Sequence, residues 1–175
     1  MKIEIISKST RFRRVIVPEQ SYCRGIYYSN KYLDVFHKVI DAFLPEGAEV
    51  KPQEARGLFL SRIETLETRK KEYGLEAITD VMGRSGFDFI NPGDMPLSET
   101  IDRWNGAKCI VTFSGTDAHN VLFLRNASEK ELIIINKCQN FNMLQRDFNL
   151  LKHVKCTYVD AYSQTAPVLA GEGPF

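Results

Sequence analysis

The sequence predicts an α/β fold in which a mainly parallel sheet is covered by helices on both faces. Two observations lead to this prediction. Short runs that are apolar at nearly every position recur after residue 56, and such runs are typical of parallel strands buried on both faces. Segments with a helical spacing of apolar residues lie between most of these runs, and they provide the crossovers that parallel neighbours need.

The strands and helices of this sheet can be assigned from the pattern. The expected strands are residues 57–60, 87–90, 109–113, 132–135 and 154–159. The expected helices between them cover about residues 75–85, 97–104, 118–124 and 142–151. Gly86 ends the first of these helices, and Asn142 with Gln145 forms a capping box at the start of the last.

The part of the chain before residue 57 is less regular. Residues Ile3–Ile6 and Arg14–Val17 are expected to form short strands, the second ended by Pro18. A structured loop at 18–29 precedes a helix with apolar residues at helical spacing, which Pro45-Glu46-Gly47 ends before a linker at 45–56. We therefore expect an N-terminal β/α segment over 1–50, the α/β domain over 51–160, and a flexible C-terminal tail over 161–175.

Composition limits the function classes. A chain of 175 residues, 43% hydrophobic, can bury a core without disulfides or metal. A formal net charge of +1 argues against a nucleic-acid partner. The four cysteines form no Cys-x-x-Cys pair, which suits a reducing compartment, so we expect a cytoplasmic protein. No apolar run is long enough to predict a transmembrane segment, and the N-terminus has no signal-peptide pattern.

The stretch from Cys109 to Phe123 is the most informative part of the sequence. A buried strand runs into the polar turn Ser114-Gly115-Thr116-Asp117 and then into a helix. Backbone N–H groups of such a turn can face an anion, and the helix dipole favours one by about 0.3–1 kcal/mol. The other interpretation is an ordinary strand–turn–helix junction that binds nothing.

Several polar segments are expected to meet at one edge of the sheet. Ligands of open parallel sheets bind beyond the carboxyl ends of the strands. The polar segments that follow those ends are residues 61–69, 91–98 and 114–120, together with Asn136-Lys137. The sequence therefore predicts a site for a phosphorylated ligand at this edge.

Individual residues have competing interpretations. Arg62 could hold phosphate oxygens bidentately, or form a surface ion pair with Glu64 worth only about 0–1 kcal/mol. His119 could act as a base or a donor near neutral pH, whereas Asp117 could simply cap the helix.

The sequence has no Gly-x-Gly-x-x-Gly, no P-loop, no Asp-x-Asp and no His-x-x-x-His. We therefore expect no metal site and no cofactor, and protein donors must neutralise any diphosphate.

An ordered series of motifs resembles one known family. The segments are Leu58-Phe-Leu-Ser-Arg62, Met82-Gly-Arg-Ser-Gly-Phe-Asp-Phe-Ile90, Pro92 to Ile101, Ala107 to Gly115, Asn120-Val-Leu-Phe123 and Ile133-Ile-Ile-Asn136. In this order they look like the nucleotide-binding half of the family 61 glycosyltransferases, which include plant xylan-modifying enzymes, animal O-linked N-acetylglucosaminyltransferases and bacterial capsular-polysaccharide proteins. The resemblance covers roughly residues 56–137 and is weaker on either side.

The resemblance implies a Rossmann-like lobe of a GT-B glycosyltransferase. It implies metal-independent transfer from a nucleoside-diphosphate sugar to a glycan acceptor, in the synthesis of capsular or surface polysaccharide. By position Arg62 matches a family arginine, and Gly115 and Asn120 match the glycine and asparagine of the family turn. The implied site places the pyrophosphate on Arg62 and on Ser114, Gly115, Thr116, Asp117 and Asn120, places Asn136 near the ribose or base, and makes His119 the candidate catalytic residue.

Three positions depart from the family pattern. Ser114 stands in place of a histidine, Gly74-Leu75 in place of an Asn-Glu pair, and Asn136 in place of a glutamate. These departures leave a catalytically silent binding or assembly module of a polysaccharide-synthesis complex as an alternative. Another Rossmann-like enzyme with a different phosphorylated ligand is a third possibility. The chain is also short for a full acceptor lobe before residue 50. We therefore expect one of three cases: a fragment whose N-terminal lobe lies outside this sequence, a single-lobe relative of the family, or a chain whose activity requires a partner chain.

The substitution Arg62→Ala tests the predicted phosphate contact. Removal of the guanidinium is expected to weaken binding of a diphosphate ligand, because a charge-assisted contact is lost. Titration calorimetry on both proteins measures the difference. An unchanged affinity would remove Arg62 from the site.

Overall fold

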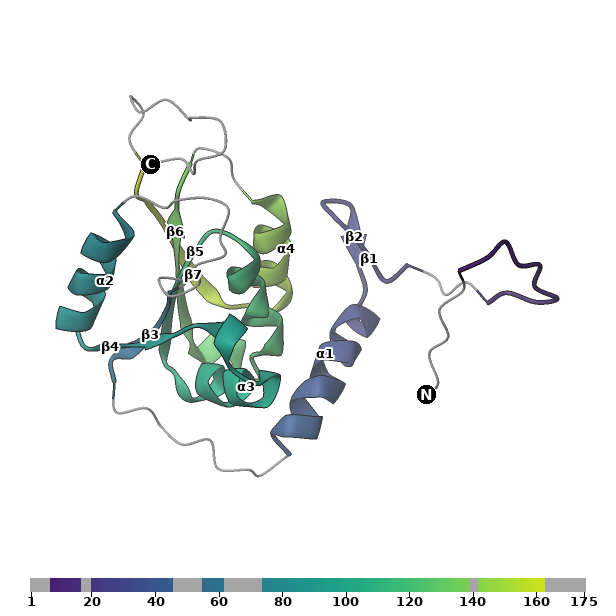
Figure 1. Cartoon of the computed structure of the whole chain (residues 1–175), viewed down its shortest axis with the longest axis horizontal. Helices are drawn as coiled ribbons and strands as arrows, with labels where there is room; N and C mark the ends of the chain where they lie inside the picture. The colour runs from purple at the N-terminus through teal and green to yellow at the C-terminus, as the bar shows by residue number, and fades with distance from the viewer. Residues whose placement is uncertain (1–6, 17–19, 46–54, 62–73, 139–141, 163–175) are drawn as a thin grey trace.

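The computed structural model describes residues 7–16, 20–45, 55–61, 74–138 and 142–162 (Figure 1). It confirms an α/β fold with a parallel sheet of five strands in the order β4-β3-β5-β6-β7. The strands are β3 (Gly57–Leu60), β4 (Phe87–Ile90), β5 (Cys109–Phe113), β6 (Glu131–Asn136) and β7 (Lys155–Asp160). The expected strands are therefore confirmed to within one residue at each end.

Helices lie on both sides of this sheet. Figure 1 shows α2 on one side, and α3 and α4 on the other. The helices are α1 (Asn30–Phe43), α2 (Leu75–Arg84), α3 (Leu97–Gly106) and α4 (Met143–Leu151). Gly86 has a φ of 79° after α2, as the sequence predicts. At the start of α4 the Asn142 side chain accepts a hydrogen bond from the Gln145 N–H, but the Gln145 side chain does not bond back, so only half of the predicted capping box forms.

The alternation of side chains along the strands divides the core between the two faces. Leu58 and Leu60 pack with Trp104 of α3 and Phe148 of α4. Phe59 points to the opposite face and shares a smaller cluster whose other buried members are Phe87, Val111 and Ile135. Burial on both faces explains why these strands are apolar throughout rather than alternating.

The connection between β5 and β6 differs from the expectation. Instead of an α-helix it forms the 3-10 helix η2 (Thr116–Phe123), followed by η3 (Ala127–Glu129). Thr116, Asp117, His119 and Asn120 are weak α-helix formers, so the tighter and less regular turn is accessible. The predicted α-helix dipole at Gly115 is therefore absent, and any anion there must be bound by individual donors.

The N-terminal part also differs from the expectation. Residues 14–16 form no strand, and Val15 and Ile16 are exposed. Ile3–Ile6 and Val17 lie outside the described residues. The expected loop instead contains a small hairpin of β1 (Tyr22–Cys23) and β2 (Tyr27–Tyr28), with Gly25 at a φ of 68° in the turn. With no apolar neighbours to bury them, the side chains at 15 and 16 gain nothing from strand formation.

Helix α1 packs on the same side of the sheet as α3 and α4. Its buried Ile40 and Leu44 contact Ile101 of α3, and Tyr32 stacks on Tyr22 with ring centroids 4.9 Å apart. The described residues from Tyr22 to Leu44 therefore share a core with the sheet domain. The expected domain boundary near residue 50 falls among residues 46–54, which lie outside the described part, so this boundary remains a prediction. The flexible tail also remains a prediction, because its residues 163–175 lie outside the described part.

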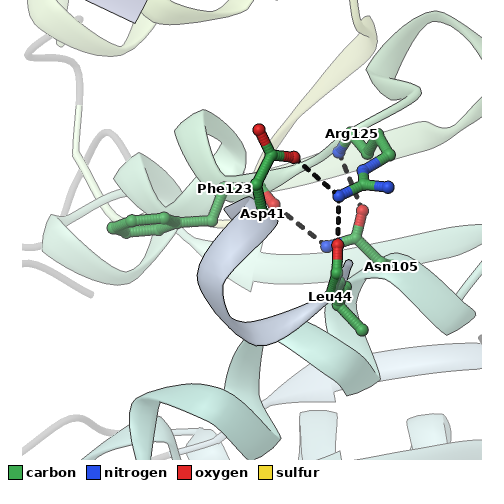
Figure 2. Close-up of polar contacts among 5 residues, drawn as sticks. All are labelled: Asp41, Leu44, Asn105, Phe123 and Arg125. Atoms are coloured by element: carbon green, nitrogen blue, oxygen red, sulfur yellow. Dashed lines mark hydrogen bonds and ion pairs between the residues drawn. The ribbon is translucent and has the colours of Figure 1, made fainter. Parts of the chain in front are cut away.

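Polar contacts also attach α1 to the sheet domain (Figure 2). The Arg125 guanidinium donates to Asp41 Oδ1 at 2.8 Å and to the Leu44 carbonyl. The Arg125 backbone N–H donates to Asn105 Oδ1 at 2.8 Å, and Asn105 Nδ2 donates to the carbonyls of Ile101 at 2.8 Å and Phe123 at 2.9 Å. The amide of Asn105 thus joins α3 to the end of η2, and Arg125 extends the link to α1.

The substitution Gly57→Ala tests the tight pairing of β3 with β5. A Cβ on Gly57 would lie 2.4 Å from the Cys109 carbonyl oxygen and 2.9 Å from Phe87 Cε1. The strands must separate to admit it, so we expect a loss of about 1–3 kcal/mol in the free energy of unfolding, measured by urea denaturation.

Gly83→Ala in α2 is the matched control. Its Cβ would meet only the Phe89 ring, at 3.4 Å, and alanine favours the helix by about 0.5–1 kcal/mol. Equal effects of the two substitutions would contradict the close approach of β3 and β5.

Candidate functional site

The strand order creates a topological switch point between β3 and β5. The chain passes from β3 outward to β4, and then returns across β3 to β5. The helices that follow these adjacent strands lie on opposite faces of the sheet, with α2 after β3 on one face and η2 after β5 on the face of α3 and α4. Phe59 lies opposite Val111 in the register, so Ser61 after β3 and Ser114 after β5 start from neighbouring strand ends. Ligands of open α/β sheets bind at such a switch point.

The polar turn after β5 offers fewer free amides than the sequence suggests. The Ser114 N–H donates to the Ile135 carbonyl at 2.9 Å, and the Ala118 N–H donates to the Gly115 carbonyl at 3.2 Å. Within the described backbone, the N–H groups of Gly115 and Thr116 have no such partner. No atom lies within 4 Å of a Cβ built on Gly115, so the space beside this glycine is open. Two amides at the switch point can therefore donate to a ligand.

His119 of η2 packs against the start of α4. Its ring meets the Phe148 ring edge-on with centroids 5.3 Å apart, and its Nε2 lies 3.4 Å from Asn142 Nδ2. Because Asn142 Oδ1 already accepts from the Gln145 N–H, the amide nitrogen faces the imidazole. An amide nitrogen can only donate, so this contact favours the tautomer with a bare Nε2 and a proton on Nδ1.

Burial decides the charge of this histidine. It lowers the pKa of His119 from 6.5, since desolvation disfavours the imidazolium, and the nearby Asp117 opposes the shift less strongly. His119 is therefore mainly neutral at pH 7. A neutral imidazole with a proton on Nδ1 can donate one hydrogen bond from that atom.

Asn136 is placed at the same edge, at the end of β6. It lies opposite Asp160 of β7 and is 9% exposed. Its Nδ2 donates to Asp160 Oδ1 at 2.9 Å, so the amide oxygen can accept from a ligand and the second N–H can donate to one. The Ser114 N–H donates to the carbonyl of Ile135, the residue before Asn136. This hydrogen bond places Asn136 next to the turn after β5.

Lys137 is a positively charged residue at the same edge. Its position there was predicted from the sequence, but no function was assigned to it. Its Nζ lies 5.6 Å from the centroid of the Phe113 ring, at the end of β5. The ammonium therefore stands between the ends of β5 and β6. Its position could have been anticipated, because Lys137 directly follows a buried parallel strand whose neighbour is β5.

A buried chain of amides holds η2 in place. Gln145, 1% exposed, donates from Nε2 to the Ala118 carbonyl at 3.1 Å and to Asn149 Oδ1 at 2.8 Å. Asn149 Nδ2 donates in turn to the Tyr158 hydroxyl on β7 at 3.1 Å. Burial is the main cause that raises the pKa of Tyr158 to about 12. The i, i+4 spacing of Gln145 and Asn149 on the face that carries Leu144 and Phe148 was the sequence signal for this network.

The predicted site residues thus fall into two groups. Arg62 lies outside the described residues. The other predicted site residues follow β5 or end β6, so the fold brings them to one edge of the sheet. They are Ser114, Gly115, Thr116, Asp117, His119, Asn120 and Asn136. Within the described ranges no three His, Cys, Asp or Glu side chains are grouped for a metal ion, and no helix there is long and apolar enough to cross a membrane.

Comparison with known proteins gives one match. The model of a protein family described as Glycosyltransferase 61 matches residues 4–133 of this chain of 175 residues. The match begins well before the motifs quoted above and ends inside β6, so it includes α1 and the switch point. No curated protein and no solved structure matches the chain.

The ionisation of His119 gives a testable pH dependence. A proton NMR titration of its ring is expected to give a pKa below 6.5, and Asp117→Asn is expected to lower it further because an attractive charge is lost. Since the neutral ring is favoured only in the folded protein, stability is lost as the pH falls from 6.5 toward the folded-state pKa. His119→Gln is expected to flatten that part of the stability curve. A pKa above 6.5 would contradict the burial of this ring.

Proposed function

Because the chain belongs to glycosyltransferase family 61, we propose that the carboxyl edge of its sheet binds the diphosphate of a nucleoside-diphosphate sugar. One observation carries the proposal. The order β4-β3-β5 puts a switch point at the ends of β3 and β5, and the polar turn from Ser114 begins there. The lobe then acts as the donor-binding half of a GT-B enzyme.

Charge neutralisation supports a diphosphate as the ligand. The open amides of Gly115 and Thr116 can donate to phosphate oxygens, and Lys137, at the end of the neighbouring strand β6, supplies a cation at the same edge of the sheet. Arg62, which follows Ser61 in the sequence, is proposed as the second cation. These donors do in this proposal what a metal ion does in other nucleotide-sugar enzymes, so no cofactor is part of it.

His119 is proposed to donate a hydrogen bond rather than to remove a proton. Its Nε2 is directed at Asn142, and its proton is placed on Nδ1. A donor at this position stabilises the negative charge that grows on the departing nucleoside diphosphate. The proton of the acceptor hydroxyl must then go to another group, which the glycan-binding part of the enzyme provides.

The wider role follows from the family. We propose transfer to a glycan acceptor in capsular or surface polysaccharide synthesis, on the cytoplasmic side, with the acceptor held by a second lobe or by a partner chain. Asn136 is proposed to accept from the ribose or base through its amide oxygen. A catalytically silent binding module is the alternative, because Ser114 and Asn136 carry no charge.

Titration calorimetry with uridine and guanosine diphosphates tests the proposed site. We expect binding of one of them, and an affinity about tenfold weaker in Lys137→Gln, because a charged contact to phosphate is worth about 1.5–3 kcal/mol. Lys108→Gln removes an exposed lysine at the opposite end of β5 and is the matched control. We expect it to leave the affinity unchanged.

A donor-hydrolysis assay on the same samples separates the two functions. Turnover supports the enzyme, whereas binding without turnover supports the silent module. Failure of both nucleotides to bind contradicts both functions. An equal loss of affinity in Lys137→Gln and Lys108→Gln would move the site away from the carboxyl edge.

A further inference from the structure

An open cavity lies at the edge of the sheet opposite to the proposed donor site. It has a volume of about 420 Å³ and is lined by residues of α1, of the segment that precedes β6, and of the turn between α4 and β7. The polar residues that line it include His37 of α1, Arg125 and Glu129 before β6, and Lys152 and His153 before β7. Because the last four precede strands rather than follow them, this cavity is separate from the carboxyl-edge site.

Lys152 is the unusual residue of this cavity. It is 7% exposed, yet no hydrogen bond or ion pair of its ammonium is found among the described residues. Lys152 Nζ is not among the side-chain atoms of the described residues that are sealed from solvent without a hydrogen-bond partner. Those atoms are Thr79 Oγ1, Trp104 Nε1 and Gln145 Oε1. The ammonium is therefore not sealed from solvent, and Lys152 is one of the residues that line the cavity.

Local structure does not fully explain this lysine. Its aliphatic stem can pack beside Leu151, and a cation is favoured at the carboxyl end of α4. Neither effect requires a lysine that is only 7% exposed and has no counter-charge among the described residues. Burial lowers the pKa of Lys152 from 10.5, which means that the charged form is disfavoured in this place. An anion in the cavity would reverse that effect.

The other charges of the cavity are already balanced or lie at its margin. Arg125 is paired with Asp41 at 2.8 Å, and Glu129 is exposed. His37 and His153 are both exposed and can donate from their rings. His153 has a φ of 52°, in the left-handed region that non-glycine residues rarely adopt. Lys152 is thus the cation of this cavity that lacks an anion.

We propose that this cavity binds the anionic group of a sugar acid or sugar phosphate, with Lys152 as its charge partner. The volume suits a monosaccharide, and the aliphatic surface of Leu33 can contact the sugar ring. His37 and His153 donate hydrogen bonds to its oxygens. The site is independent of the proposed diphosphate site, since it shares no residue with it.

Titration calorimetry with glucuronate, glucose 6-phosphate and glucose tests this site on the full chain. We expect one or both anions to bind, the better of them identifying the preferred group, and glucose to bind at least tenfold more weakly. Lys152→Met is expected to weaken anion binding at least tenfold, whereas Lys152→Arg retains it. Lys155→Met is the matched control, because Lys155 is exposed and pairs with Glu131 at 3.4 Å. It is expected to change the affinity less than twofold.

Thermal unfolding of the same proteins distinguishes a ligand site from a structural lysine. Without ligand, Lys152→Met is expected to raise Tm, because a buried charge without a partner is removed. With the anion at ten times its Kd, Tm of the unsubstituted protein is expected to rise by about 3–6 °C, and that of Lys152→Met to stay constant. The proposal is overturned if neither anion binds, if Lys152→Met binds as well as the unsubstituted protein, or if Lys152→Met lowers Tm. Because no nucleotide is used, these outcomes do not depend on the diphosphate site.

Discussion

The close parallel pairing of β3 with β5 is the constraint on which the rest of the structure depends. Gly57 lets the two backbones approach where a Cβ would strike the Cys109 carbonyl. Because β4 then lies on the far side of β3, the chain must cross β3 to reach β5, and its connections cover opposite faces. The switch point at the ends of these strands, where the donor site is proposed, is a geometric result of that order.

Helix α4 contributes residues to both edges of the sheet. The start of α4 presents Asn142 to His119 at the carboxyl edge, and its end presents Lys152 to the opposite cavity. The buried amides of Gln145 and Asn149 lie between these ends and fix α4 against η2 and β7. A rigid α4 therefore positions side chains for two separate sites, which places its buried polar face among the most sensitive parts of the molecule.

The sequence predicted what depends on local pattern. Strands such as Cys109–Phe113 are encoded within a few residues and were found as predicted. Of the capping box, only the half made by the Asn142 side chain was found, because the Gln145 side chain is used in contacts with Ala118 and Asn149. The segment after β5 forms a 3-10 helix instead of the predicted α-helix. Its weak helix formers have little intrinsic preference for the α-helix, so tertiary packing determines its conformation.

Contacts between residues far apart in the chain were beyond prediction. His119 meets Asn142 only after α4 docks on η2, and His37 faces the cavity of Lys152 only after α1 packs. The role of Arg62 as a phosphate ligand is a sequence inference that stays a prediction.

The link through Asn105 and Arg125 also bears on where the protein can be divided. Asp41 and the Leu44 carbonyl satisfy the Arg125 guanidinium, while Ile40 shields Ile101 from water. A fragment that starts beyond α1 would expose this apolar surface and leave the guanidinium without its partners. The smallest autonomous folding unit therefore includes α1, although the sheet begins only at Gly57.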